Sequence, residues 1–503
     1  MSEVNPRIQI LKRDVEQQVF RPLRNHGWST EFVREHDYHS SLECRARKQQ
    51  RVFNFAVLYG SATDNDHYLS LSRENERIFF HGQEYQLEVF ARNVPVPVGP
   101  LEEFFPVLVE LNKEIEPDKT PTKQRPRKRR IKRITDENPI GAIFSRLEQF
   151  TSVKLCEKLV RRRLEEENVV KDEEVVRAKA EGVAYSMRNA LDYYKSTSGN
   201  SLNSRILGLY YGTLSFAFCE MLASPNGPES LDDVESMTKS GHGLFTFSSD
   251  QHSISDLHVG VLASGFLPQW LNFLGVDTSR FPRKKAKNIG DVSDDTRHMS
   301  CTFGHLLGSF PEIDDLYHEV VGGEPSWVLP QFDRLGNTFG LSRSKTRSIG
   351  STYCQIVDYS GKITLERLSA ACLPLAEITE IVDGECPPGA KVYRARVDHV
   401  GYDIWWEVLP THSSPSKNNN SLLLPSIAGL SDYRVLALIG LYVLSIAVRY
   451  MPSTWRQVEG GKEDEYLAII KALLGVWERV IPEKFLESIA DERVLAAQPG
   501  SWM

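Results

Sequence analysis

The residues best suited to chemistry lie at the end of an apolar segment near the C-terminus, where Arg449-Tyr450 is followed by Pro452 and Trp455. A helix that ended here would place the guanidinium near the negative end of the helix dipole, and Pro452 would stop the helix. The arrangement predicts a pocket whose rings stack on a base or nucleotide while the arginine pairs with a phosphate. The alternative is a buried arginine that binds helix carbonyls among packed rings. The predicted pocket residues are Tyr193, Tyr194, Tyr210, Tyr211, His242, Arg449, Tyr450 and Trp455.

His242 lies between Gly241 and Gly243. Flanking glycines let the backbone turn tightly, so the imidazole could approach a ligand closely. A purely structural turn explains the same pattern.

A basic run from Lys119 to Arg133 contains two prolines and no acidic residue. Such a run repels itself and favours an extended linker or arm. It also suits binding to phosphate backbones, or to an acidic partner protein. The predicted nucleic-acid contacts are Lys123, Arg125, Arg127, Lys128, Arg129, Arg130, Lys132 and Arg133, with a second patch at Arg283, Lys284, Lys285 and Lys287.

Most recognised catalytic motifs are absent from the sequence. It contains no G-x-x-x-x-G-K-[ST], no H-E-x-x-H and no G-x-S-x-G, which argues against a P-loop NTPase, a helix-borne zinc hydrolase and a nucleophile elbow. No C-x-x-C pair exists, and the seven scattered cysteines indicate reduced thiols rather than a disulfide framework. The sequence identifies no cofactor and predicts no metal site.

The N-terminal region carries acidic residues and histidines that could meet in space. The acidic residues include none that opens the E-x-K pattern of many metal nucleases, and exposed side chains explain them. The histidines could approach neighbouring aspartates, although a surface role is the simpler interpretation. The histidines are His36, His39, His67 and His81, and the aspartates are Asp37, Asp64 and Asp66.

Two segments must position the aromatic pocket. Within Met187 to Leu222, apolar and aromatic residues recur at the spacing of one helix face. Arg434 to Trp455 is uncharged between Arg434 and Arg449, which is too short to span a bilayer and predicts a helix buried on all sides. We expect the two helices to pack together.

These segments resemble the YaaC-like family over about residues 187–485. The resemblance rests on motifs that occur in the order associated with that family. They are Tyr193-Tyr194, Leu207-x-Leu209-Tyr210-Tyr211-Gly212, Gly241-His242-Gly243-Leu244, Leu306-Leu307-x-x-Phe310-Pro311-Glu312-Ile313 and Arg449-Tyr450-x-Pro452-x-x-Trp455. The family is bacterial and has no assigned reaction, so the resemblance implies a fold and a lineage rather than a chemistry.

The predicted architecture is α+β. Residues 1–115 read as a helix followed by an antiparallel sheet, with alternation at 42–46, 53–59, 69–71, 78–80 and 85–89. Residues 116–138 read as the basic linker. Residues 139–503 read as a large, mainly helical domain with a β insertion near 351–410, including a hairpin of 392–396 with 404–408.

Composition places the protein among ordinary globular chains with a net charge of −7, which argues against a protein that is basic throughout. The N-terminus lacks the apolar run of a signal peptide, so we expect a soluble cytoplasmic protein without membrane contact. The leading hypothesis is a nucleic-acid-associated or partner-binding component of a bacterial multi-protein system, with antiviral defence as its setting. The alternatives are a nuclease or nucleotide-processing effector with a site in the helical domain, and a dimerising scaffold.

Overall fold

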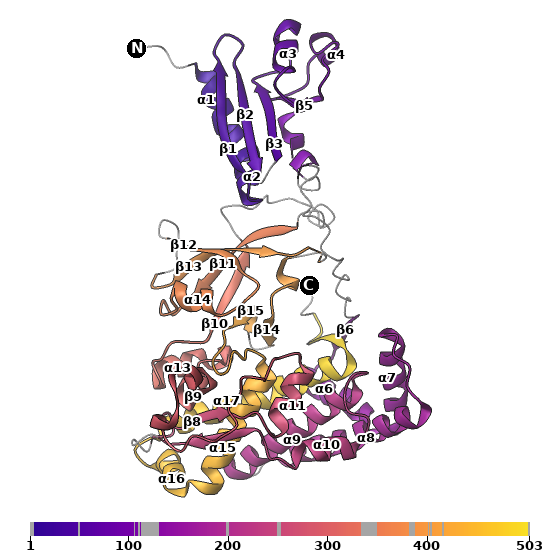
Figure 1. Ribbon diagram of the computed structural model, residues 1–503, viewed down its shortest axis with the longest axis vertical. Helices are drawn as coiled ribbons and strands as arrows, with labels where there is room; N and C mark the ends of the chain where they lie inside the picture. Colours follow the sequence, from indigo (N-terminus) through magenta and orange to yellow (C-terminus); the bar gives the residue numbers. More distant parts are fainter. Residues whose placement is uncertain are drawn as a thin grey trace.

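The computed structural model describes most of the chain and confirms the α+β class. The described residues are 5–48, 51–104, 106–108, 111, 130–197, 201–248, 253–332, 350–381, 388–400, 402, 405–414 and 417–500. An N-terminal sheet unit occupies one end of the long axis, a six-stranded sheet lies in the middle, and the helices lie at the other end (Figure 1).

The N-terminal unit packs one long helical segment against a five-stranded sheet. The segment runs from α1 (Pro6–Val15) through a π-helical turn (Glu16–Phe20) to α2 (Arg21–Asn25), and its apolar face is buried. Asn5 caps its start by accepting a hydrogen bond from the Arg7 amide at 3.0 Å. The strands, in their order across the sheet, are β1 (Ser29–His36), β2 (Ser41–Lys48), β3 (Arg51–Leu58), β4 (Arg77–Phe80) and β5 (Val98–Pro100).

Three details of this unit differ from the sequence prediction. The β3–β4 and β4–β5 pairs run parallel, so the sheet is mixed. The stretch at 69–71 belongs to helix α3 (Asn65–Leu71), because Asp64 caps the helix by accepting from the His67 amide at 2.7 Å. The stretch at 85–89 overlaps the short helix α4 (Leu87–Phe90) and is not a strand.

The helical body is built around α9 (Leu202–Ala223) and α15 (Tyr433–Tyr450), which pack together as predicted. Both helices are apolar and long enough to cross a membrane, but 78% and 72% of their most apolar windows are buried, as in core helices. The surrounding helices are α6 (Pro139–Glu148), α7 (Val153–Glu166), α8 (Glu173–Lys195), α10 (Leu231–Thr238), α11 (Phe266–Phe273), α12 (Phe303–Leu307), α13 (Asp314–Val320), α16 (Pro452–Gly460) and α17 (Glu465–Ala490).

A buried ion pair joins α9 to the start of α15. Arg434 donates to the Glu220 carboxylate and also binds Asp432 at 2.8 Å. The Trp270 indole donates to the second oxygen of Glu220 at 3.0 Å. Each charge therefore has several partners, which buried ions require.

The β insertion is larger than predicted. Its strands, in their order across the sheet, are β12 (Ala376–Glu380), β13 (Lys391–Asp398), β11 (Ser351–Asp358), β10 (Trp327–Phe332), β15 (Lys417–Leu423) and β14 (Thr411–Ser414). The predicted hairpin of 392–396 with 404–408 is wrong, because β13 pairs with β11 and Trp405–Glu407 forms a 3₁₀ turn. His412 of β14 fixes the sheet to the helices through a 2.6 Å contact with buried Glu312.

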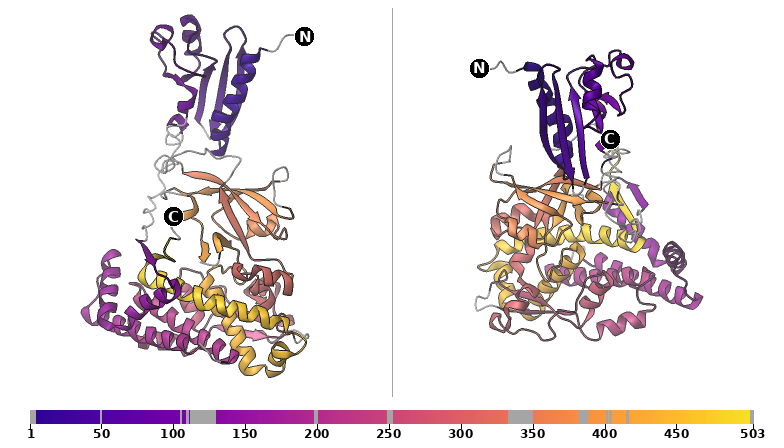
Figure 2. Two further views of the ribbon diagram at one scale, coloured as in Figure 1. Left: turned by 180° about the vertical axis from the view of Figure 1, so that it is seen from behind. Right: turned by 45° about the horizontal axis from the view of Figure 1, so that its top comes forward.

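A parallel strand pair closes the helical body. Strand β6 (Arg130–Thr135) pairs with β16 (Glu492–Ala497), so the end of the predicted linker is an ordered strand. The two strands lie side by side in both turned views (Figure 2). A three-stranded sheet of β7 (Leu244–Phe247), β8 (His258–Val261) and β9 (Ser300–Thr302) covers another part of the helices.

Candidate functional site

Most of the predicted pocket residues gather where the C-terminal ends of α8 and α15 meet α9. The rings of Tyr193 and Tyr211 stack with centroids 5.7 Å apart and an interplanar angle of 29°. Arg449 donates from Nη1 to the Tyr211 hydroxyl at 3.3 Å, and its guanidinium carbon lies 5.0 Å from the centre of the Tyr450 ring. We call Tyr193, Tyr211, Arg449 and Tyr450 the tyrosine–arginine surface.

The guanidinium of Arg449 is oriented by its own helix. Nε donates to the Ser445 carbonyl at 3.0 Å, and Nη2 donates to the Ser445 hydroxyl at 3.2 Å. Arg449 donates to neutral oxygens, and among the described residues no carboxylate forms an ion pair with it. Arg449 therefore binds a helix carbonyl, as the alternative interpretation of the sequence expected. Its positive charge is nevertheless not compensated by a described carboxylate.

His242 lies behind this surface. Its Nδ1 is 2.9 Å from the hydroxyl of Tyr210, which is buried against Tyr442. Burial and then the nearby Arg449 lower the pKa of His242, so the imidazole is neutral at pH 7.

The glycines around His242 have a structural cause. Gly241 and Gly243 have φ angles of +92° and +79°, which favour glycine. The carbonyls of Gly241 and His242 accept hydrogen bonds from Phe266 and Leu267 at the start of α11, at 2.9 and 3.0 Å. A Cβ on Gly243 would lie 2.5 Å from Pro268, so close packing against α11 fixes the turn.

Besides Tyr210 and His242, two further predicted residues do not belong to the surface. Tyr194 points into the core, where its ring contacts Phe216 and its hydroxyl lies 3.2 Å from that of Thr213. Trp455 is 4% exposed and donates to Asn203 at 2.9 Å. The Tyr-Tyr motif could not distinguish these roles, because adjacent helical residues point about 100° apart.

The second basic patch is connected to the His242 turn through the backbone. Leu262 donates to the Gly243 carbonyl and Ala263 donates to the Pro282 carbonyl, both at 2.9 Å. The four basic side chains that follow Pro282 are exposed, and none of them forms an ion pair with a described residue. They are Arg283, Lys284, Lys285 and Lys287.

The first basic run has a different setting. Lys123, Arg125, Arg127, Lys128 and Arg129 lie outside the described residues. Arg130, Lys132 and Arg133 belong to strand β6, where Arg130 lies 3.4 Å from Glu166 and Lys132 lies 3.9 Å from Glu492. The charges of Arg130 and Lys132 are therefore partly compensated by carboxylates.

The N-terminal histidines come together as the sequence allowed. His39 and His67 stack at 3.9 Å, with His39 3.2 Å from Asp64 and the His67 ring 2.9 Å from the Ser41 hydroxyl. His36 lies 2.7 Å from Glu43. Across the described ranges no three histidine, cysteine or acidic side chains are arranged to hold a metal ion. His81 contacts Asp14 instead, at 3.3 Å.

Comparison with known proteins gives one result. The model of the family described as YaaC-like Protein matches residues 148–489, which contain the tyrosine–arginine surface and the second basic patch. No curated protein and no solved structure matches the chain.

Proposed function

The chain belongs to the YaaC-like family, and from that premise we propose that it is a nucleic-acid-associated protein whose helical domain binds single-stranded nucleic acid. The tyrosine–arginine surface receives a base and its phosphate, and the second basic patch attracts the adjoining phosphates. The expected protein partner, the bacterial multi-protein system and the cytoplasmic location stay predictions.

The single observation that carries this proposal is that Arg449 has no carboxylate partner among the described residues. A guanidinium has five N–H donors, and Arg449 uses three of them in hydrogen bonds to neutral oxygens. The other two donors and the net positive charge stay available to an anion. Phosphate is the anion that a planar guanidinium binds with two parallel hydrogen bonds. Arg449 is already oriented by Ser445 and Tyr211, so binding costs less side-chain entropy.

Exposed rings beside Arg449 supply the second half of the ligand contact. Tyr450 is 67% exposed and Tyr193 is 40% exposed, although aromatic side chains are usually buried. Stacking of a base on an aromatic ring contributes about 1–3 kcal/mol and tolerates every base. The surface therefore favours a single strand without strong sequence preference.

The experiment is fluorescence anisotropy with labelled oligo(dT) and oligo(U) at several salt concentrations. We expect Arg449→Ala and Tyr450→Ala each to weaken binding by about tenfold or more. Arg177→Ala is the matched control, because Arg177 lies on α8, is largely exposed and, within the described part of the chain, pairs with Glu181 on its own helix. Arg449→Lys, which keeps the charge, should recover part of the affinity. Equal affinity of Arg449→Ala, Tyr450→Ala and wild type, with all folded by circular dichroism, would refute the proposal.

The basic patch is tested through the salt dependence. Each phosphate neutralised on a single strand adds about 0.7 to the slope of log affinity against log salt. The double variant Lys284→Ala/Lys285→Ala should therefore have a shallower slope than wild type. An unchanged slope would remove the patch from the interface and leave the stacking site standing.

A second candidate function is a nucleotide-processing enzyme at the same surface. The observation that favours it is the 2.9 Å contact between Tyr210 and Nδ1 of His242, which fixes the imidazole while no described residue is bonded to Nε2. A neutral imidazole of fixed orientation next to an arginine can transfer a proton during phosphoester chemistry. His242→Ala would then abolish turnover of a nucleotide substrate while oligonucleotide binding persists. If His242→Ala kept both the turnover and the oligonucleotide binding of wild type, this enzymatic function would be excluded.

A further inference from the structure

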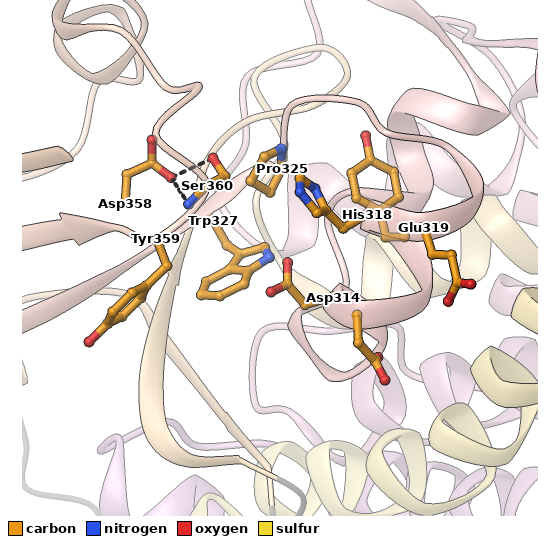
Figure 3. Close-up of a pocket in the computed structure, with 10 residues that line it drawn as sticks. Asp314, His318, Glu319, Pro325, Trp327, Asp358, Tyr359 and Ser360 are labelled. Atoms are coloured by element: carbon orange, nitrogen blue, oxygen red, sulfur yellow. Dashed lines mark hydrogen bonds between the residues drawn. The ribbon is translucent and has the colours of Figure 1, made fainter. Parts of the chain in front are cut away.

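A concave site lies far from the tyrosine–arginine surface in the sequence. It is a pocket of about 290 Å³ between α13 and the ends of β10 and β11, the two central strands of the six-stranded sheet. Tyr317, Pro325 and Trp327 form its apolar wall, and the side chains of Asp314 and Glu319 lie along α13 beside it (Figure 3).

The apolar wall is rigidly built. The Tyr317 and Trp327 side chains are 2% and 6% exposed, and the Tyr317 hydroxyl donates to the Glu324 carbonyl at 3.2 Å. A Cβ on Gly323 would lie 2.3 Å from that hydroxyl, and one on Gly308 would lie 2.8 Å from it, so both glycines allow the ring to sit there. The wall therefore exists before any ligand arrives.

The opposite rim is fixed by Asp358. Its carboxylate accepts from the Ser360 amide at 2.9 Å, the Ser360 hydroxyl at 2.6 Å and the Ile363 amide at 2.8 Å. These contacts use both oxygens and hold the turn that carries Tyr359, whose ring is 50% exposed. Asp358 thus shapes the pocket and is not available to a ligand.

Asp315 and Glu319 add two carboxylates to the pocket lining. No lysine or arginine lines it. Two cations outside the lining have other partners: Lys362 donates to the neutral Gly322 carbonyl at 2.6 Å and keeps its charge, whereas Arg367 pairs with Glu324 at 2.8 Å. Asp315 and Glu319 are exposed, and neither has an ion-pair partner among the residues that the structure describes.

Helix stability does not account for Glu319. Acidic residues in the first turn of a helix interact favourably with its dipole, which explains Asp315. Glu319 lies in the last turn of α13 (Asp314–Val320), where the same dipole disfavours an anion. An uncompensated carboxylate in this position, at the mouth of a preformed aromatic pocket, is consistent with a ligand that supplies positive charge.

We propose that this pocket binds a small alkyl diamine or polyamine. One ammonium group would lie against the Trp327 or Tyr359 ring, since ring faces attract cations. The methylene chain would contact Pro325 and Trp327, and the other ammonium would pair with Asp315 and Glu319. A metal ion fits less well, because aromatic rings supply no oxygen ligands for a hard cation.

Isothermal titration calorimetry of the full chain with putrescine and spermidine tests the proposal. We expect saturable binding to wild type, at least a fivefold loss of affinity in Glu319→Gln and in Asp315→Asn, and no binding of the neutral isostere 1,4-butanediol. The matched control is Glu174→Gln on α8, an exposed carboxylate outside the pocket, which should bind as wild type does.

The contrary results are distinct. Equal binding by wild type and by the double variant Glu319→Gln/Asp315→Asn would show general attraction to an acidic protein and would overturn the proposal. Absence of any heat of binding would overturn it as well. Both variants change exposed side chains, so the fold should persist, and oligonucleotide affinity at the tyrosine–arginine surface should be unaffected.

Discussion

At the scale of single residues, the Glu220–Arg434 pair is a buried contact that joins two core helices of the helical body. Removing one member of a buried pair leaves the other charge without compensation, which costs about 3–5 kcal/mol. We therefore expect Glu220→Ala to lower the melting temperature strongly by scanning calorimetry, since Arg434 would lose one of its two carboxylate partners among the described residues and Trp270 would lose its acceptor. Arg177→Ala, which breaks an exposed pair, should change stability by less than about 1 kcal/mol. Equal effects of the two variants would contradict this assignment.

Glu483 of α17 makes stability depend on pH. Its side chain is buried, and burial raises its pKa from 4.5 to about 7. A carboxyl whose folded pKa is raised contributes stability that is fully present below the unfolded pKa and is lost as the pH rises through about 7. Glu483→Gln, which cannot ionise, should therefore match wild type at pH 4.5 and exceed it at pH 8, by on the order of 3 kcal/mol. A pH-independent difference between their melting temperatures would show that Glu483 ionises freely in the folded protein.

At the scale of elements, glycines set how closely the helices approach. A Cβ on Gly212 of α9 would lie 2.6 Å from the ring of Tyr194 on α8, so α8 and α9 could not keep their spacing. Gly212→Ala should cost about 1–3 kcal/mol through overpacking. Gly475 of α17 is the matched control, because its Cβ would meet only the tip of Arg205 at 3.8 Å. Gly475→Ala should stabilise by up to about 1 kcal/mol, since alanine favours the helix. Thermal melts that gave both variants the same sign would argue against this packing.

The elements also show where sequence reasoning succeeds. Helices α9 and α15 were predictable because their apolar residues form patterns within a short stretch of sequence. In α9 apolar residues recur at helical spacing, and in α15 they form an uncharged run. The strand predicted at 69–71 was wrong because the Asp64 cap outweighed the local alternation of apolar residues. The hairpin of 392–396 with 404–408 was wrong because β13 pairs with β11, and partners that distant leave no local signal.

The candidate site was predictable only in part, for the same reason. The sequence predicted Arg449 and its aromatic neighbours as site residues. It could not predict that Tyr194 points into the core or that Trp455 binds Asn203, because both depend on tertiary packing. The pocket beside α13 gave no motif, because it combines α13 with strands β10 and β11. The basic run was predicted as an extended linker, and the structure shows Arg130–Thr135 as strand β6 through its pairing with a distant segment.

At the scale of the whole molecule, the β6–β16 pair ties the start of the helical domain to its end. Val494 of β16 is 2% exposed and Ile134 of β6 is 4% exposed, so both face the core. Val494→Asp should separate the strands and increase trypsin cleavage after Arg130, Lys132 and Arg133, as measured by mass spectrometry. Arg493→Asp introduces the same residue at the neighbouring exposed position and should leave cleavage unchanged. Equal protection in Val494→Asp would mean that β6 is held by other contacts.

The strand pair also has a consequence for biosynthesis. During translation β6 leaves the ribosome before the rest of the helical domain. It cannot pair with β16 until β16 emerges, after the helices between them have been made. The N-terminal sheet unit needs no such late segment, because its five strands pair among themselves. Nascent chains should therefore carry a folded N-terminal unit followed by a helical domain that lacks its β6–β16 pair. We expect chaperone binding to be greatest before β16 emerges.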